Sequence, residues 1–308
     1  MSAVPVDEAP LVTLADLSEI ELVMLKRMRE VTLGDHRGRA HGAGFDFVGL
    51  RDWQAGDRPS AIDWPQSTMT NFSPLVVREF EQPSTGSVLA VADQSLSTRC
   101  GVDGVPIART VAHAVATIGV SAGFFQDPFG ILTFDRGFQC LGTVRPRTGR
   151  GHVVHCLDAY QHGRGLQPLA PASSISTTLA GHVRGTAMLP VISDFLFRDA
   201  ADIVRELALL NAVHDVFLVL VDAAHAFELP PVSTGWIETI DVETGQTQTI
   251  SRRGLTQMAD RARRWQADVE RAARDQDLDL VRIGPDHPTA DIALGDFVAE
   301  RRLRKTKN

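Results

Sequence analysis

The stretch Ser87-Val88-Leu89-Ala90-Val91-Ala92-Asp93-Gln94-Ser95-Leu96-Ser97 contains the pattern that decides the fold class of this chain. Its first half is an apolar run after Gly86, which is typical of a buried strand in a parallel sheet. The polar residues that follow therefore stand at the carboxyl end of that strand, where open α/β sheets place their ligand sites. A second apolar run, 188–192, leads in the same way into Ser193-Asp194. The two strand ends predict a site at one edge of a sheet.

The residue types at these strand ends indicate a metal site made of oxygen ligands. Asp93, Ser95 and Ser97 alternate along the chain, so one carboxylate and two hydroxyls can face a single point. Asp194 adds a second carboxylate, and ligands of this kind suit Mg²⁺ or Mn²⁺. The alternative is that Asp93 and Ser95 only cap the following helix. The Asp-x-Ser-x-Ser motif alone fits both interpretations, and Asp194 favours the metal.

The composition of the chain is that of an ordinary globular protein. Its 308 residues are 44% hydrophobic and 22% charged, and this length corresponds to roughly two domains. The net charge of −7 argues against a nucleic-acid-binding protein. No run approaches the about 18 consecutive apolar residues of a membrane span, and residues 1–10 lack the pattern of a secretory signal. Three scattered cysteines form neither a disulfide framework nor a zinc motif, so we expect a cytoplasmic protein.

Apolar periodicity divides the chain into alternating helices and strands. It predicts helices over residues 15–31, 107–125, 151–160, 174–183, 202–212, 255–274 and 290–302. It predicts strands over residues 75–80, 87–92, 129–134, 138–144, 188–192, 216–221 and 278–283, and a hairpin over 236–250. Strands separated by helices imply an open, mostly parallel α/β sheet flanked by helices. We expect three parts: an N-terminal segment over 1–85, this α/β domain over 86–228, and a hairpin and helical extension over 229–308.

A longer series of residues resembles a known family. The upstream part reads Gly44-Phe45-Asp46-Phe47-Val48-Gly49-Leu50-Arg51-Asp52-Trp53-Gln54-Ala55-Gly56-Asp57, then Ile62-Asp63-Trp64 and Val77-Arg78-Glu79-Phe80-Glu81. Phe129-Gly130-Ile131-Leu132-Thr133-Phe134 and Ser193-Asp194-Phe195 fit the same pattern. Together these residues resemble the domain of unknown function 58 family, whose members are von Willebrand factor A-like proteins.

The resemblance implies an open sheet of the von Willebrand factor A type with a metal-ion-dependent adhesion site (MIDAS) at its edge. The metal ligands that it implies are Asp93, Ser95, Ser97, Ser173 and Asp194. Asp194 would bind the ion directly or through a water. A domains usually supply a Thr from a middle loop, and Ser173 stands in its place and keeps the hydroxyl. Thr177 or Thr178 is the alternative for this ligand.

The resemblance also implies a function in binding. Members of the family are associated with MoxR-type AAA+ ATPases and are thought to assist the assembly or remodelling of other proteins. We therefore expect a non-enzymatic adaptor that holds Mg²⁺ or Mn²⁺ and binds a partner protein, either the ATPase or its client. Such a site has no general base and no nucleophile, which favours binding over catalysis.

Two enzymatic alternatives stay open at this point. Gly119-Val120-Ser121-Ala122-Gly123 matches the nucleophile elbow of serine hydrolases, with Asp194 or Asp222 and His225 or His287 as possible triad partners. That motif needs a strand–turn–helix context, whereas here it falls within the helix predicted over 107–125. A metal-dependent phosphoesterase could use the two strand-end Asp residues. Enzymes that resemble haloacid dehalogenases, however, need a second Asp where this chain has Ser95.

The upstream motif carries one further expectation. Arg51, Asp57, Asp63 and Trp64 should form a buried or half-buried polar network that fixes the N-terminal segment. Buried charged groups are stable only when they are paired, so loss of one partner would cost about 3–5 kcal/mol.

Overall fold

The chain divides into two units, which are described separately. One comprises Met1–Val31 and Gly86–Asn308, and the other comprises Thr32–Thr85. The computed structural model describes residues 9–35, 46–54, 62–69, 71–81, 86–102, 105–135, 138, 140–170, 174–183, 185–227, 236–240 and 246–305.

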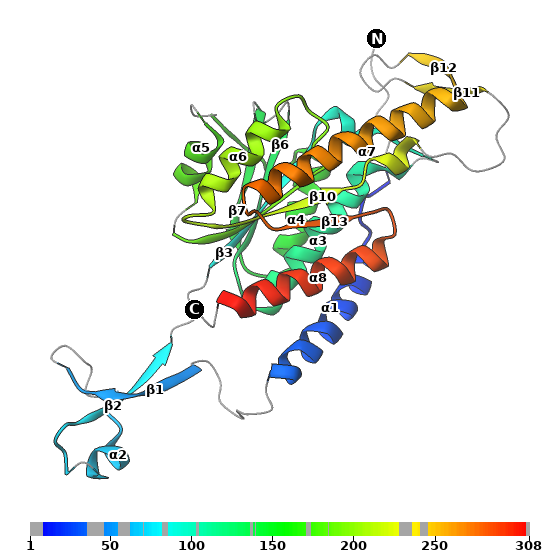
Figure 1. Ribbon diagram of the computed structural model, residues 1–308. Helices are drawn as coiled ribbons and strands as arrows, with labels where there is room; N and C mark the ends of the chain where they lie inside the picture. The colour runs from blue at the N-terminus through cyan, green and yellow to red at the C-terminus, as the bar shows by residue number, and fades with distance from the viewer. Residues whose placement is uncertain are drawn as a thin grey trace. The chain divides into compact units, whose positions relative to one another are not determined.

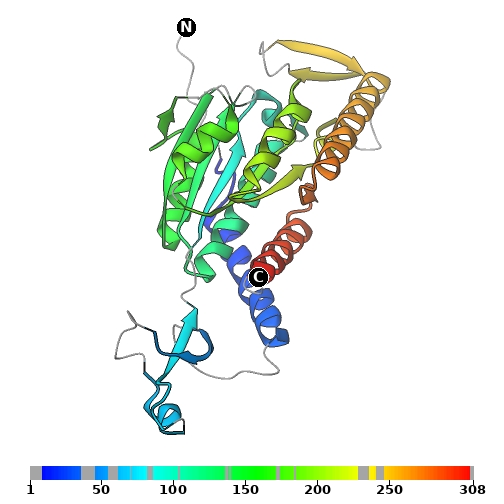
Figure 2. The same ribbon diagram turned by 60° about the vertical axis from the view of Figure 1, so that its left-hand side comes forward.

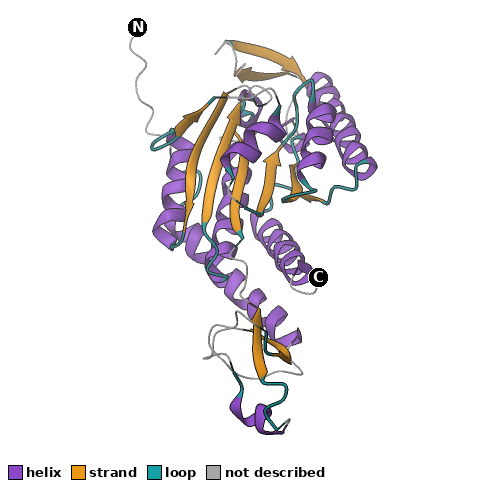
Figure 3. Cartoon of the chain, turned by 90° about the vertical axis from the view of Figure 1, so that its left-hand side faces the viewer, coloured by secondary structure: helices purple, strands orange, loops and turns teal. Residues whose placement is uncertain are grey.

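A seven-stranded sheet forms the centre of the larger unit (Figures 1 and 3). Its strands, in spatial order, are β13 (Leu280–Ile283), β10 (Asp215–Val221), β9 (Ala187–Ser193), β3 (Ser87–Asp93), β6 (Phe129–Asp135), β7 (Cys140–Arg147) and β8 (Gln167–Leu169). The strands from β13 to β6 pair in parallel, whereas β7 pairs antiparallel with both β6 and β8. The open, mostly parallel α/β sheet predicted from the sequence is confirmed.

Alternate residues of the strands face two helical layers, because successive side chains of a strand point to opposite faces. On β3, Ala90 and Ala92 belong to one core cluster, and Leu89 and Val91 belong to the other. The first layer consists of α1 (Leu14–Asp35), α3 (Ile107–Phe124), α4 (Arg150–His162) and α8 (His287–Lys305). The second consists of α5 (Ile175–His182), α6 (Ala200–Leu210) and α7 (Arg252–Asp275).

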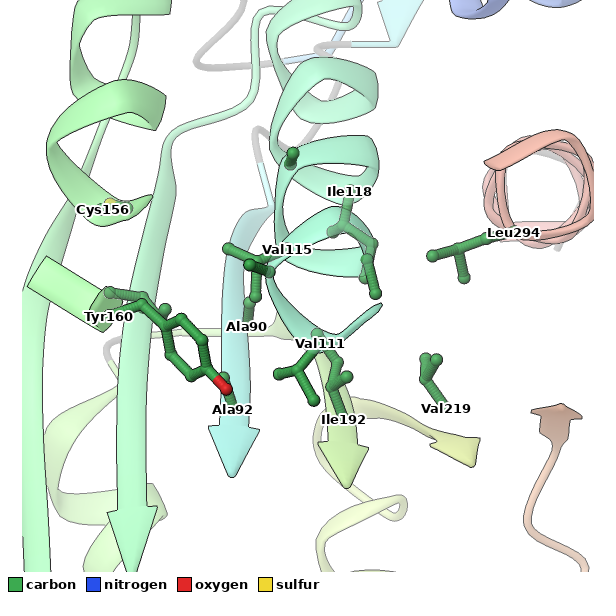
Figure 4. Close-up of a cluster of buried hydrophobic side chains, with 14 of the residues drawn as sticks. Ala90, Ala92, Val111, Val115, Ile118, Cys156, Tyr160, Ile192, Val219 and Leu294 are labelled. Atoms are coloured by element: carbon green, nitrogen blue, oxygen red, sulfur yellow. The ribbon is translucent and has the colours of Figure 1, made fainter. Parts of the chain in front are cut away.

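Helices from both ends of the chain close the first core. Figure 4 shows Val115 of α3 over Ala90 of the central strand, with Leu294 of α8 beyond it. Helices α1 and α8 lie side by side (Figures 1 and 2), and a Cβ added at Gly295 would clash with the thioether of Met24. The first layer is therefore assembled from segments that are far apart in the sequence.

Helix α7 shows how the sequence sets a buried face in the second layer. Its buried residues recur every three or four positions, as expected for a helix with one face on a core: Leu255, Ala259, Ala262, Gln266, Val269 and Ala273. Ser251 caps its start, since the Ser251 hydroxyl accepts a hydrogen bond from the Gly254 N–H at 3.1 Å. Within this fully described helix, Gln266 is the single polar member of the buried stripe.

The C-terminal residues are part of the central fold, which corrects the expected division at residue 228. Strand β13 pairs with β10 and extends the sheet, and α8 packs in the first core. The hairpin expected over 236–250 is present as β11 (Trp236–Ile240) paired antiparallel with β12 (Thr247–Ser251). Short elements complete the unit: η2 (Leu96–Arg99), β4 (Gly101–Val102), β5 (Val105–Pro106) and η3 (Ala224–Phe227).

The smaller unit contains β1 (Asp46–Asp52), paired antiparallel with β2 (Val76–Glu81), and α2 (Trp64–Met69). Asp63 is buried and caps α2, because its carboxylate accepts a hydrogen bond from the Gln66 N–H at 3.2 Å. Trp64 is 55% exposed, so the expected buried network is wrong for this residue. It begins α2 with its ring toward solvent, next to the residue that caps the helix. Asp57 and the side chain of Arg51 lie outside the described residues.

Helix α3 meets the length and hydropathy criteria for a membrane span, and in the described parts of the chain no other helix does. However, 72% of this helix is buried inside the protein, and the core helix of a protein without any membrane span meets the same criteria. The finding is weak evidence in either direction.

The role of Asp63 as a helix cap leads to a test of the smaller unit. Asp63→Ala should lower the free energy of unfolding by about 1–2 kcal/mol, the usual cost of losing an N-cap, while Asp63→Asn should cost less because Asn also caps. Urea unfolding followed by circular dichroism measures both. A loss of about 3–5 kcal/mol in Asp63→Ala would instead indicate a broken buried ion pair.

Candidate metal site at the carboxyl edge of the sheet

The ends of β3 and β9 meet at the point where the direction of strand addition reverses. From β3 the chain continues through α3 to β6 on one side, and β9 later pairs on the other side. Open α/β sheets bind ligands at such switch points, outside the carboxyl ends of the strands. The two strand ends noted in the sequence therefore lie where this architecture places a site.

The register of β3 and β9 brings Asp93 opposite Ser193. Ala92 pairs with Ile192, so the next residues of the two parallel strands are neighbours on the same face. The Ser193 hydroxyl donates to Oδ2 of Asp93 at 2.5 Å, and the Ser95 N–H donates to Oδ1 at 2.7 Å. Both oxygens of this fully buried carboxylate are thus held in place.

The two hydroxyls of the first loop also face each other. The Oγ atoms of Ser95 and Ser97 are 3.0 Å apart, and both residues are half-buried. The loop is fixed by Thr98, whose hydroxyl donates to the Ser95 carbonyl at 2.8 Å. The Ser97 hydroxyl lies close enough to Asp194 to lower the pKa of that carboxyl. The structure therefore brings Asp93, Ser95, Ser97 and Asp194 together.

One oxygen of Asp194 has no hydrogen-bond partner. Its Oδ1 accepts from the Leu196 N–H at 3.0 Å, whereas Oδ2 is buried and has no hydrogen bond of normal geometry; the nearby Ser97 hydroxyl, which lowers the pKa of this carboxyl, does not reach that geometry. Because a polar atom buried without a partner costs free energy, such atoms are rare and call for an explanation.

Burial is the main reason why the pKa values of Asp93 and Asp194 are raised. Burial, followed by the charge of Asp93, raises the pKa of Asp194 to about 7. Burial also raises the pKa of Asp93; hydrogen bonds from Ser193 and Ser95 oppose that shift, and the charge of Asp135 adds to it. Neither Asp93 nor Asp194 forms an ion pair with any basic side chain that the structure describes. Buried carboxylates are usually paired or bound to a metal, and these two lack a pair.

Tyr160 of α4 contacts the main chain of Asp93. Its hydroxyl donates to the main-chain carbonyl of Asp93 at 2.8 Å, and Figure 4 shows the ring over the end of β3 near Ala92. Burial, with the charges of Asp93 and Asp194, raises the pKa of Tyr160 well above its usual range. The phenol therefore stays protonated and serves as a hydrogen-bond donor.

A cavity of about 1020 Å³ lies beside the first loop. The residues that connect it to the site are Gln94 and Thr98, and its other polar walls include Arg99, Arg109 and Asp135. Gln94 Nε2 donates to the Tyr160 carbonyl and so links the loop to α4. The cavity is therefore a neighbour of the site, since its lining includes Gln94, Thr98 and Tyr160 but none of the four predicted ligands that the structure describes.

The remaining predicted ligand is not placed. Ser173 lies outside the described residues, and its alternatives are engaged at the start of α5. The Thr178 hydroxyl donates to the Ser174 carbonyl at 2.8 Å, and the Thr177 hydroxyl is 2.8 Å from that of Ser174. Ser193, in contrast, was not predicted as part of the site. Its position after an apolar run was visible, but its contact with Asp93 depends on the strand register.

The serine-hydrolase alternative gains no support at Ser121. This residue is buried within α3, and its hydroxyl donates to the Thr117 carbonyl of the preceding turn at 2.7 Å. The surrounding Gly119 packs against Phe129 and Val153, where a Cβ would be too close to both. Gly119 therefore serves close helix packing, whereas a Cβ at Gly123 would meet no atom within 4 Å.

A family model described as "Protein of unknown function DUF58" matches residues 49–276. The chain belongs to this family. No curated protein and no solved structure matches it. The matched span of this DUF58 protein includes both strand ends of the candidate site and extends through α7.

The donor set of the site fits a hard divalent cation. Two carboxylates and two serine hydroxyls converge, and one buried carboxylate oxygen has no other partner. In the described parts of the chain, no cluster of three or more His, Cys, Asp or Glu side chains could hold a metal. A site that depends on serine hydroxyls would not form such a cluster.

The raised pKa of Asp194 predicts how the metal-free protein responds to pH. The folded state binds a proton at Asp194 up to about pH 7, whereas the unfolded state releases it near pH 4. Stability should therefore fall as the pH rises through this window. Asp194→Asn cannot ionise, so it should be more stable than the wild type at pH 8, by an amount on the order of 2–4 kcal/mol, with a smaller gain at pH 5.

Urea unfolding in EDTA at the two pH values measures this difference. Asp222→Asn is the matched control: Asp222 directly follows the neighbouring strand β10, but its carboxylate accepts from the Ala224 N–H and pairs with Arg282 at 3.2 Å. This variant should be destabilised. Equal destabilisation of Asp194→Asn at both pH values would contradict the account of its ionisation.

Proposed function

We propose that this DUF58 protein is a non-enzymatic adaptor that holds Mg²⁺ or Mn²⁺ at its strand-end site and binds a partner protein there. The observation that carries the proposal is the unpaired, buried Oδ2 of Asp194 next to the carboxylate of Asp93. A divalent cation would neutralise both charges and supply the missing partner.

The residues that would hold the ion are Asp93, Ser95, Ser97 and Asp194. When bound, the ion supplies positive charge and a coordination position that a carboxylate from a partner can fill. Ser193 and Tyr160 hold Asp93 through its carboxylate and its carbonyl, so they orient this ligand without competing for the ion. The half-buried Ser95 and Ser97 leave the outer side of the site accessible.

The chemistry of these side chains supports binding over catalysis. The groups around the site are carboxylates, hydroxyls, the amide of Gln94 and a phenol whose pKa is raised. None of these is a nucleophile activated by a neighbouring base, which hydrolysis of an ester requires. The partner we propose is a MoxR-type AAA+ ATPase or its client, and this part rests on the resemblance to the family.

The ion is tested first by calorimetry. Wild-type protein should bind Mn²⁺ and, at a free concentration of 100 times Kd, gain about 2.7 kcal/mol in unfolding free energy. Asp93→Ala should abolish both effects, whereas Asp222→Asn should keep them. Because Asp194 must lose a proton to bind the ion, affinity should also rise between pH 6 and 8. Mn²⁺ binding by Asp93→Ala equal to that of the wild type would refute the site.

The partner is tested by retention of a MoxR-type ATPase from the same organism on immobilised protein. Retention should require Mg²⁺, be lost in EDTA, and weaken in Asp93→Ala and Asp194→Ala. Equal retention in EDTA would place the contact elsewhere. Metal-dependent hydrolysis of p-nitrophenyl phosphate by the purified protein would instead favour the phosphoesterase alternative.

A further inference from the structure

The turn that carries Asp194 has an unusual backbone. Phe195, the next residue, has a φ of 53°, in the left-handed region that bulky side chains rarely adopt. A conformation of this kind persists only where the surrounding structure holds it. The Phe195 N–H donates to the Ser193 hydroxyl at 2.8 Å, and the Phe195 ring is fully buried in the second core.

Two adjacent residues of α7 hold the carbonyl groups of this turn. Nε2 of Gln266 donates to the Asp194 carbonyl at 3.1 Å. Nε1 of Trp265 donates to the Phe195 carbonyl at 2.8 Å. Both peptide groups on either side of the left-handed residue are therefore fixed from outside the turn.

Gln266 also ties this turn to the next two strands. Its Nε2 donates to the carbonyl of Val221, the last residue of β10, at 2.7 Å. Its Oε1 accepts from Arg282 of β13 at 3.3 Å, and Arg282 in turn pairs with Glu270 at 2.9 Å. Gln266 is fully buried, and both the nitrogen and the oxygen of its side-chain amide form hydrogen bonds. An apolar residue would fill this place in the stripe equally well, so the amide is needed for the hydrogen bonds.

We propose that Gln266 and Trp265 are positioning residues of the strand-end site, which hold the backbone of Asp194 and Phe195 and so keep the Asp194 carboxylate beside Asp93 and Ser97. The inference rests on the metal binding proposed above. Groups that orient a ligand in this way typically change metal affinity by about 10- to 100-fold when they are removed.

Two substitutions test this role. Trp265→Phe removes the N–H donor but keeps an aromatic ring at a side chain that is 39% exposed, and Gln266→Met keeps the length of a buried side chain without its amide. Each should weaken Mn²⁺ binding about 10-fold or more in calorimetry. The matched controls are Trp236→Phe, in the β11–β12 hairpin, and Gln276→Met, at the exposed end of α7; both should bind as the wild type does.

A spectroscopic measurement separates positioning from general stability. In a protein whose other tryptophans, Trp53, Trp64 and Trp236, are replaced by Phe, emission reports on Trp265 alone. Titration with Mg²⁺ should give a saturable change in that emission, and the change should be absent when Asp194→Asn is added. A residue that only supports the fold would show no such response.

The outcomes distinguish this inference from the proposed function. Absence of Mn²⁺ binding by the wild type would refute the proposed function. Binding by the wild type with unchanged affinity in Trp265→Phe and Gln266→Met would overturn the positioning role alone, even if both variants were less stable. If Gln266→Met fails to fold, Trp265→Phe together with the emission titration decides the question.

Discussion

The in-register pairing of β3 with β9 is the constraint on which the candidate site depends. It places Asp93 and Ser193 side by side and leaves Asp194 just beyond the end of β9. A slip of one residue would turn every side chain of a strand to the opposite face. The apolar residues of these strands, buried on both faces, prevent that slip, because each face packs against its own helical layer. The apolar residues that form the core therefore also determine the direction in which the polar side chains at the end of these strands point.

At the carboxyl edge of the sheet, the arrangement that we propose for metal binding lowers the stability of the metal-free protein. The fold buries two carboxylates together and leaves one oxygen without a partner, which disfavours the charged, metal-free state. Proteins retain such groups mainly at functional sites, where the rest of the structure holds them in place. Here the supporting groups come from both layers: Tyr160 of α4 on one side, and Gln266 and Trp265 of α7 on the other. The second layer is thus part of the site as well as part of the core.

Most of the fold could be predicted from the sequence, because the apolar residues of this chain recur at clear helix and strand spacings. The helices and strands of the central sheet differ from their predicted bounds by only a few residues; β9, for example, was expected over 188–192 and is Ala187–Ser193. The elements that were missed include β8 and α2, which are too short for periodicity to reveal, and the seven-residue β1, whose sequence does not alternate strictly between apolar and polar residues. The exposure of Trp64 was also missed, since an aromatic residue next to Asp63 suggests burial when the helix cap is not recognised.

The candidate site was predictable only in part, because some of its contacts are local and others are not. Asp93, Ser95 and Ser97 could be found because they follow one apolar run, and Asp194 because it follows another. Ser193 requires the strand register, which no local pattern gives. Gln266 contacts the Asp194 carbonyl across 72 residues, from a helix whose sequence is rich in arginine. Such supporting residues have no signal in the sequence except a polar side chain within an otherwise apolar stripe.

The most direct test of the central claim is a crystal structure of the protein grown in Mn²⁺, with anomalous diffraction data collected near the manganese absorption edge. We expect an anomalous peak between Asp93 and Asp194, with the hydroxyls of Ser95 and Ser97 among the ligands of the ion. A structure in which Oδ2 of Asp194 contacts only protein atoms, with no anomalous peak at the ends of β3 and β9, would contradict it.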